Sequence, residues 1–285
     1  MNLEFSTNTI EFYTIILLLV FLQFVNWILE AFKFRVLYQP YESITIKSSI
    51  YSVYIGNFTS FFTPDRMGSF IGRILYLKNS SKLMITAVTA LGNLAQLIIT
   101  ILFMIIGSIL YLLIDHDLVV LSKELMLTII PVYLLIFNLL IVIYFKPNLT
   151  FKYMHKWNLL KSYISRLESL DKLSVKTKVL VLVLAIFRYI IFYLQFYLLI
   201  KYLNINISGI ELLVFVGLLY GIITFVPSPF MGNIGTREAL SIYLASSILG
   251  LYAPIISFII WLINVALSTL IGGCIYSFVT RKEVK

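Results

Sequence analysis

Residues 59–77 read TSFFTPDRMGSFIGRILYL, and this stretch interrupts a chain that is otherwise strongly apolar. It places a proline, an aspartate, glycines and arginines among hydrophobic residues, in a chain that is 60% hydrophobic and 12% charged. A backbone break at membrane depth is tolerated only where it is buried in protein or lines a polar cavity. The stretch therefore predicts a broken helix beside a polar site within a membrane.

The composition as a whole is that of a polytopic membrane protein. The mean hydropathy is +0.98, and several apolar runs reach the roughly 20 residues that cross a bilayer. No polar stretch among the 285 residues is long enough for a separate soluble domain. We therefore expect one all-α integral membrane domain over residues 1–285. The expected full crossings are five, at about 10–32, 83–114, 125–145, 179–203 and 254–280.

Two interrupted hydrophobic segments, at about 48–80 and 210–249, are predicted to be re-entrant hairpins. Both pass from an apolar helix through proline and glycine to an arginine and a second apolar helix, so we expect an oppositely oriented pair, as in an inverted repeat. The limb 65–77 would be about 20 Å long as a helix, short of the roughly 30 Å hydrocarbon core, although the charge pattern fits two short crossings equally well. The expected breaks are Pro64, Gly68 and Gly72 in the first segment, and Pro227, Pro229, Gly232 and Gly235 in the second.

The net charge of +9 is explained by membrane topology. The first 32 residues contain no Lys or Arg, whereas residues 146–178 and the C-terminal end are rich in both. Because cytoplasmic loops carry the basic excess, we expect the N-terminus outside and the C-terminus inside the cytoplasmic membrane, and no nucleic-acid partner. Within the basic loop 146–178, the spacing of apolar residues predicts a helix lying on the membrane surface. Those residues are Tyr153, Trp157, Leu160, Ile164 and Leu167.

The candidate anion-binding residues lie on the second limbs of the hairpins and on one crossing helix. Arg66, Ser69 and Arg73 are spaced three and four apart and so share one helical face. Each second limb begins at a hairpin tip, so its helix N-terminus directs free N–H groups into the membrane, and arginine suits bidentate binding of phosphate. The full set of candidates is Arg66, Ser69, Arg73, Arg188, Arg237 and Glu238.

Each candidate also has a structural interpretation, and both stay open. The long side chains of Arg66 and Arg73 could extend so that their guanidinium groups lie at the inner membrane interface. Arg237 with Glu238 could form a pair or cap at the second tip, and Arg188 could bind unwound carbonyls.

Further polar residues are candidates for lining the same cavity: Asn26, Glu30, Asn93, Gln96 and Gln195. For Glu30 we expect pairing with Lys33 or Lys47 near the interface. The amides are more often hydrogen-bonding partners between helices than ligands.

The chain resembles the lysylphosphatidylglycerol synthase transmembrane region family, whose members are also described as flippase-like. The resemblance rests on GNFTSFFTPDRMGSFIGRILYL, FVPSPFMGNIGTREAL and NWILEAFK, and it extends over nearly the whole chain. The sequence departs from the family pattern at Gly72, Phe230 and Met231. Members fused to a soluble aminoacyl-transferase domain make lysyl-lipid and move it between leaflets. This chain ends five residues after its last predicted helix, so the resemblance implies the lipid-handling part alone.

The expected function is translocation of an anionic lipid, either a phospholipid or a polyprenyl-phosphate-linked glycolipid. No G-x-x-x-x-G-K-[ST] phosphate-binding loop is present, so movement is expected to be passive or ion-coupled. One alternative is an intramembrane lipid-modifying enzyme, but His116 and His155 fall in loops on opposite sides, and the single cysteine, Cys274, excludes a multi-cysteine metal site. We expect no cofactor and no metal. A second alternative is a non-transporting partner of a glycosyltransferase in an envelope glycolipid pathway.

Overall fold

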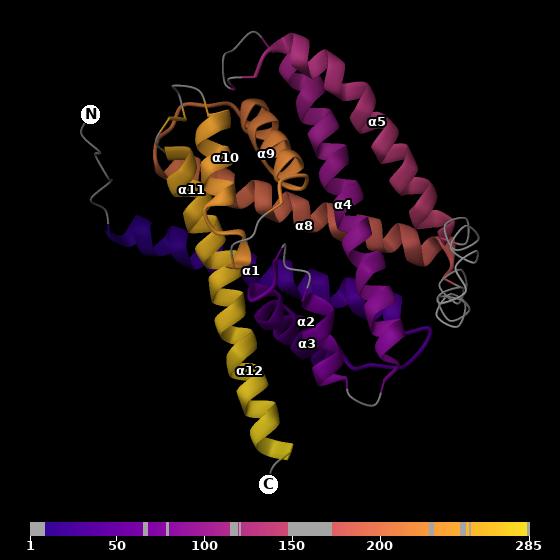
Figure 1. Cartoon of the computed structure of the whole chain (residues 1–285). Helices are drawn as coiled ribbons and strands as arrows, with labels where there is room; N and C mark the ends of the chain where they lie inside the picture. Colours follow the sequence, from indigo (N-terminus) through magenta and orange to yellow (C-terminus); the bar gives the residue numbers. More distant parts are fainter. Residues whose placement is uncertain are drawn as a thin grey trace.

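The structure is a computed structural model that describes residues 9–64, 68–77, 80–114, 119, 121–147, 173–227, 231–245, 249–250 and 252–283. Across these ranges the regular secondary structure is helical, with one isolated antiparallel bridge between Val119 and Ala245 (Figure 1). The expected all-α fold is therefore confirmed. The surface helix expected within 146–178 falls largely on residues outside these ranges.

Five helical stretches are long and apolar enough to cross a bilayer. They are α1 (Thr9–Tyr38), α4 (Lys82–Leu113), α5 (Lys123–Phe145), α8 (Val175–Tyr202), and the stretch Tyr252–Arg281. The last stretch comprises α11 (Tyr252–Trp261), a π-helical segment η5 (Leu262–Leu267) and most of α12 (Ser268–Glu283). The expected number of long apolar helices is confirmed.

Helix α1 extends further than its sequence predicted. We expected it to end at residue 32, because Lys33 begins a basic stretch, but it continues to Tyr38 with Lys33 only 1% exposed. The lysine is accommodated because its ammonium lies 2.6 Å from the carboxylate of Glu30, one turn earlier. The charge of Lys33 is thus balanced by an ion pair inside the fold, and it does not mark the membrane interface as we had expected.

The first interrupted segment forms two short helices, α2 (Ile46–Phe61) and α3 (Ser69–Tyr76), and α3 folds back along α2 (Figure 1). Gly72 permits this close packing, because a Cβ atom added to it would lie 2.3 Å from the carbonyl oxygen of Ile55. The Thr59 hydroxyl accepts the N–H of Gly72 at 3.1 Å and lies 2.9 Å from the carbonyl oxygen of Gly68. One threonine side chain therefore serves the backbone that the break leaves unpaired.

The second interrupted segment contains α9 (Gly209–Ile223), a single 3-10 turn η4 (Met231–Asn233) and α10 (Thr236–Leu244). Gly232 and Gly235 have φ values of 64° and 81°, the left-handed region that glycine enters at little cost. The indole N–H of Trp261 donates to the carbonyl oxygen of Gly232 at 2.7 Å. Helix α11 thus fixes this tip from outside the segment.

The two interrupted segments touch each other at their breaks. Phe61 is the last residue of α2, and a Cβ atom added to Gly232 would lie 3.0 Å from its ring and 3.1 Å from Val265 of η5. The end of α2, the turn η4 and the π-helical segment therefore meet at one place.

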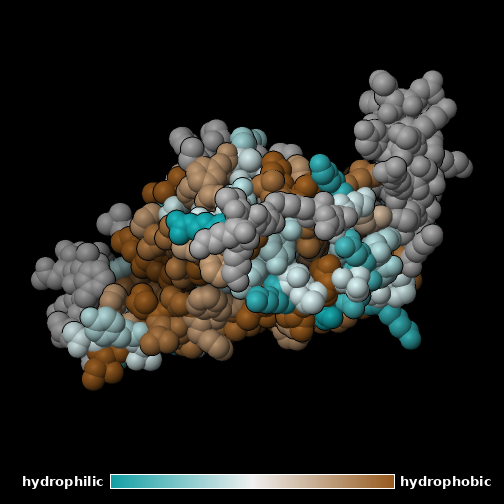
Figure 2. All heavy atoms as spheres, turned by 90° about the horizontal axis from the view of Figure 1, so that it is seen from below, coloured by the Kyte–Doolittle hydropathy of each residue, from teal (hydrophilic) through white to brown (hydrophobic). Residues whose placement is uncertain are grey.

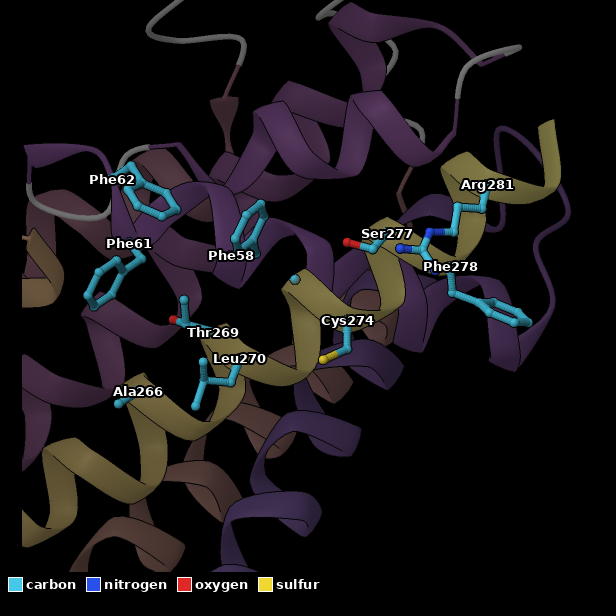
Figure 3. A pocket seen from close by; sticks show the side chains of 11 residues that line it. Phe58, Phe61, Phe62, Ala266, Thr269, Leu270, Cys274, Ser277, Phe278 and Arg281 are labelled. Carbon is cyan, nitrogen blue, oxygen red and sulfur yellow. The ribbon is translucent and has the colours of Figure 1, made fainter. Parts of the chain in front are cut away.

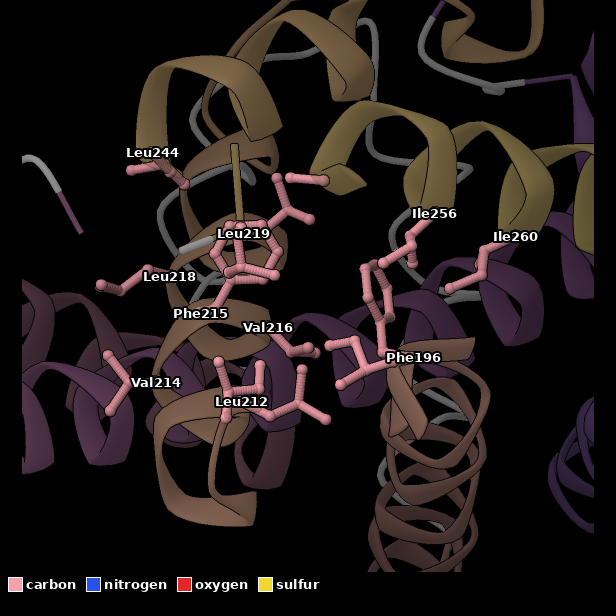
Figure 4. Packing of buried hydrophobic residues seen from close by; sticks show 14 of the residues in the cluster. Phe196, Leu212, Val214, Phe215, Val216, Leu218, Leu219, Leu244, Ile256 and Ile260 are labelled. Atoms are coloured by element: carbon pink, nitrogen blue, oxygen red, sulfur yellow. The ribbon is translucent and has the colours of Figure 1, made fainter. Parts of the chain in front are cut away.

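Two hydrophobic clusters hold the helices together. One joins α8, α9, α10 and α11 around Phe196 and Phe215 (Figure 4), and the other joins α1, α2 and the first half of α4 around Trp27 and Phe34. Helix α5 packs against α4 at the edge of the bundle, and only 6% of its most apolar 18-residue stretch is buried. The surface seen from below has extensive brown hydrophobic areas, with most hydrophilic residues in one half of the view (Figure 2). An apolar exterior of this kind suits contact with lipid chains.

Candidate functional site

The site is built on a polar stripe along one face of α1. Gln23, Asn26, Glu30 and Lys33 are spaced three, four and three apart, so they share that face. All four side chains are buried, with exposed fractions between 0 and 4%. Because polar groups buried in a membrane protein need partners, the stripe requires polar side chains from neighbouring helices.

Glu30 is the centre of an ion-pair cluster formed by three helices and four charged side chains. Its Oε2 lies 2.6 Å from the Nζ of Lys33 and also binds Nη1 of Arg188 on α8. Its Oε1 accepts a hydrogen bond from Nη2 of Arg73 on α3 at 2.9 Å. The partner expected from the sequence, Lys33, is therefore confirmed, and two arginines that the sequence did not pair with Glu30 join it.

Arg188 is held by polar groups from α1 and α4. Its Nε donates to Oδ1 of Asn26 at 2.8 Å, and its Nη1 lies 3.3 Å from Oε1 of Gln96. The amide of Gln96 in turn donates to the carbonyl oxygen of Ala185, one turn before Arg188 on α8. The guanidinium also lies 5.3 Å from the ring centre of Trp27, within the range of a cation–π contact.

Arg73 reaches the cluster because α3 packs so closely on α2. A Cβ atom on Gly56 would lie 2.7 Å from the backbone oxygen of Ser69 and 3.4 Å from the side chain of Arg73, so the glycine makes room for both. The guanidinium lies 4.5 Å above the ring of Phe34, and its Nη1 is 3.4 Å from the Thr89 hydroxyl. Its Nε has no hydrogen-bond partner among the described residues.

A polar cavity of about 220 Å³ adjoins this cluster. It is lined by residues of α1, α2, α3, α4 and α8, namely Trp27, Glu30, Asn57, Ser60, Ser69, Arg73, Asn93 and Arg188. Asn57 is 5% exposed, and its side-chain N–H groups find no partner in the described part of the chain. The cavity therefore has spare hydrogen-bond donors on both Asn57 and Arg73.

Among the residues that the structure describes, the charges around the cavity do not balance. Three cationic side chains, Lys33, Arg73 and Arg188, surround the single carboxylate of Glu30, which leaves two formal positive charges within the cluster. Buried charge without a counter-charge is destabilising. An anionic group, such as the phosphate of a lipid, would offset part of this excess.

The structure brings together some of the residues that the sequence singled out. Ser69, Arg73, Arg188, Glu30 and Asn93 line the cavity, while Asn26 and Gln96 bind Arg188 at its edge. Gln195 lies elsewhere: it donates to the carbonyl oxygen of Leu19 and accepts from Asn264 at 2.8 Å, as a link between helices. Arg66 and Pro229 are outside the described residues.

Arg237 and Glu238 lie in a separate place, at the start of α10. The carboxylate of Glu238 accepts the N–H of Gly235 at 2.7 Å, which caps the helix. The Arg237 guanidinium lies 5.5 Å from the ring centre of Tyr220. Neither residue lines the 220 Å³ cavity.

Three cavity residues were missed by the sequence analysis. Trp27, Asn57 and Ser60 line the cavity, yet none was a candidate. The signal for α2 was present, because Asn57 and Ser60 are polar residues three apart in an apolar limb and so share a face.

The fold and the cluster define a class: a polytopic membrane protein with a positively charged polar cavity among its helices. The model of the lysylphosphatidylglycerol synthase TM region family matches residues 4–272, nearly the whole chain, and the protein belongs to this family. No match was found among curated proteins. None was found among solved structures.

Proposed function

We propose that the protein moves an anionic lipid, a phospholipid or a polyprenyl-phosphate-linked glycolipid, between the leaflets of the cytoplasmic membrane. The observation that carries this proposal is the excess of two positive charges beside a polar cavity in the interior of the helical bundle. Membership of the lysylphosphatidylglycerol synthase TM region family supports a lipid as the cargo.

In this proposal the lipid phosphate occupies the cavity. Arg73 and Arg188 supply the guanidinium groups, which match phosphate oxygens in pairs, and Asn57 supplies a neutral donor. Ser69, at the N-terminal end of α3, adds the positive end of a helix dipole. Glu30 holds the two arginines in place and keeps the cluster from becoming too positive to fold.

The re-entrant arrangement belongs to the same proposal. Helix α3 has eight residues and α2 sixteen, so they are about 12 Å and 24 Å long, both short of the roughly 30 Å core. The two segments enter from opposite sides, as an inverted pair, and their tips meet where Phe61 contacts Gly232. The N-terminus is then outside and the C-terminus in the cytoplasm, as the distribution of Lys and Arg indicates.

The protein acts in this proposal as a passive or ion-coupled carrier and not as an enzyme. It requires no cofactor and no metal. A glycosyltransferase or another membrane protein is a partner only if the cargo is a glycolipid that such an enzyme makes.

The test is leaflet exchange in liposomes that contain the purified protein. Labelled phosphatidylglycerol, phosphatidylcholine and a polyprenyl phosphate are compared, in wild type and in Arg73→Gln and Arg188→Gln. We expect faster exchange of an anionic lipid, and a loss of about tenfold or more in each variant, because a hydrogen bond to a charged group contributes about 1.5–3 kcal/mol.

Lys82→Gln is the matched control, since it removes one exposed positive charge at the start of α4, away from the cavity. It should exchange lipid at the wild-type rate. Wild-type exchange by folded Arg73→Gln and Arg188→Gln would refute the site, and no exchange of any lipid by the folded wild-type protein would refute translocation.

A further inference from the structure

A second, larger hollow lies on the other side of α2 from the charged cavity. It is an open, largely apolar groove of about 810 Å³ between the end of α2 and the length of α12 (Figure 3). Its lining residues are Phe58, Phe61, Phe62, Ala266, Thr269, Leu270, Gly273, Cys274, Ser277, Phe278 and Arg281. We infer that this groove binds a membrane phospholipid with an acidic headgroup, held by its phosphate at Arg281 and by its chains along α12.

The groove follows from two rows of residues on η5 and α12. Ala266 of η5 and Leu270, Cys274 and Phe278 of α12 recur every four residues and form an apolar row, and the neighbouring row contains Thr269, Gly273, Ser277 and Arg281. Most residues in the second row are small, so the groove is deeper along that row. The helices α2 and α12 approach closely at Gly272, where an added Cβ atom would lie 2.0 Å from the carbonyl oxygen of Tyr54. The groove opens beside that contact.

The wall opposite α12 is aromatic. Phe58 and Phe61 project from the end of α2 and Phe62 follows it directly, with Phe58 and Phe62 in an edge-to-face contact at 5.4 Å between ring centres (Figure 3). Phe58 also stacks on Tyr276 of α12, at 6.0 Å. These rings and the apolar row offer hydrocarbon on both sides, which is the surface that an acyl chain contacts most favourably.

Among the described residues that line the groove, the one charged side chain lies at one end. Arg281 is exposed, and its guanidinium extends beside Ser277 (Figure 3). From Ala266 to Arg281 the helix is about 22 Å long, close to half of the roughly 40–45 Å bilayer with its headgroups. A lipid of one leaflet therefore fits, with its phosphate at Arg281 and its chain ends at Phe61.

This site is distinct from the proposed translocation site. Asn57 and Ser60 face the charged cavity, whereas Phe58, Phe61 and Phe62 face the groove, so α2 separates the two. The inference concerns a resident lipid and does not depend on lipid being moved.

The chain provides its own reporter, because Cys274 is its single cysteine, is exposed and lines the groove. The experiment measures the rate at which a small uncharged maleimide alkylates Cys274 of the full chain in an uncharged detergent, while phosphatidylglycerol or phosphatidylcholine is added. We expect phosphatidylglycerol to protect Cys274 at an about fivefold lower concentration than phosphatidylcholine, the preference that one basic residue gives for an anionic lipid.

Arg281→Gln should abolish the preference, while Lys82→Gln should keep it, and both variants should unfold at the wild-type temperature. Ser277→Phe should slow alkylation without added lipid, because the exposed serine position is where a ring would fill the groove. Equal protection by the two lipids in wild type, or a preference that survives in Arg281→Gln, would overturn the inference. Equal protection by inorganic phosphate would also overturn it, because the ligand would then be the free ion.

Discussion

The two interrupted segments share a sequence pattern but have different surroundings. In both, proline and glycine precede a second limb that carries an arginine, Arg73 in the first and Arg237 in the second. Arg73 forms an ion pair with Glu30 beside a polar cavity, whereas Arg237 lies over the ring of Tyr220. The interaction that each arginine forms therefore depends on the residue that a neighbouring helix supplies, and the proline–glycine–arginine pattern alone does not determine it.

The acidic residues of the two segments differ in the same way. Glu30 comes from α1 and joins three cations from α1, α3 and α8, while Glu238 caps the helix on which it lies. The first segment is thus tied to the centre of the bundle through charge. The second is tied through helix capping and through the Trp261 hydrogen bond to Gly232.

The largest effect is expected for Glu30→Gln. This change leaves three buried cations without a carboxylate, and breaking a buried ion-pair cluster in this way is destabilising by about 3–5 kcal/mol. Thermal unfolding in detergent measures it. Glu238→Ala, which removes the capping carboxylate, should lose only about 0.5–2 kcal/mol.

Glu124→Gln is the control for Glu30→Gln, because Glu124 is exposed in the first turn of α5 and should contribute no more than about 1 kcal/mol. If Glu30→Gln and Glu124→Gln unfold at the same temperature, the comparison between the two segments is wrong.

A second test exchanges one glycine in each segment for alanine. Gly72→Ala places a methyl group against the backbone of Ile55, so α3 must move away from α2, at about 1–3 kcal/mol, and Arg73 moves with it. Gly235→Ala meets no atom within 4 Å and is strained only by its φ of 81°, at about 1–2 kcal/mol. We expect lipid exchange to fall about tenfold in Gly72→Ala and to stay at the wild-type rate in Gly235→Ala. Similar exchange rates in the two folded variants would remove the distinction between the segments.

A third test concerns Arg237. Because its guanidinium contacts an aromatic ring and lines no part of the charged cavity, Arg237→Gln should lose about 0.5–1 kcal/mol of stability. Its lipid exchange in the liposome assay should stay within about twofold of wild type. A loss as large as that of Arg73→Gln would place Arg237 on the lipid path and make the two segments functionally equivalent.

The last test, on stability alone, concerns Trp261→Phe. It removes both the N–H group that binds the carbonyl oxygen of Gly232 and one ring of a buried indole, so we expect about 1–3 kcal/mol of destabilisation. A shift in the thermal unfolding midpoint measures it. Tyr243→Phe, at a position that is 64% exposed, is the control and should leave the midpoint unchanged.

The long apolar helices could be predicted from the sequence because hydropathy over about 20 residues is a local property. The prediction went wrong at the end of α1, where charge was interpreted as an interface. Lys33 and Glu30 neutralise each other one turn apart, and hydropathy counts each of them as polar whether or not they pair. Residues 34–38 were therefore placed beyond the end of the helix.

The candidate site could be predicted only in part. Asn26 and Glu30 of α1, the pairing of Glu30 with Lys33, and Arg73 of α3 were recognised, because spacing along one helix is visible in the sequence. Their meeting was not, since Arg73 and Arg188 lie 43 and 158 residues from Glu30 and reach it through the packing of α1, α3 and α8. Nothing in the spacing indicates that Gln195 binds Asn264 while Gln96 binds Arg188.

The distance along the chain between Glu30 and Arg188 has a consequence for biogenesis. During synthesis the N-terminal segments enter the membrane first, so Glu30, Lys33 and Arg73 are present long before residue 188 leaves the ribosome. In that interval the carboxylate has only two of its three cationic partners, and the wall that α8 gives to the cavity is absent. A nascent chain that stops short of α8 therefore has no complete cavity, which delays the appearance of the charged site until the bundle around it can close.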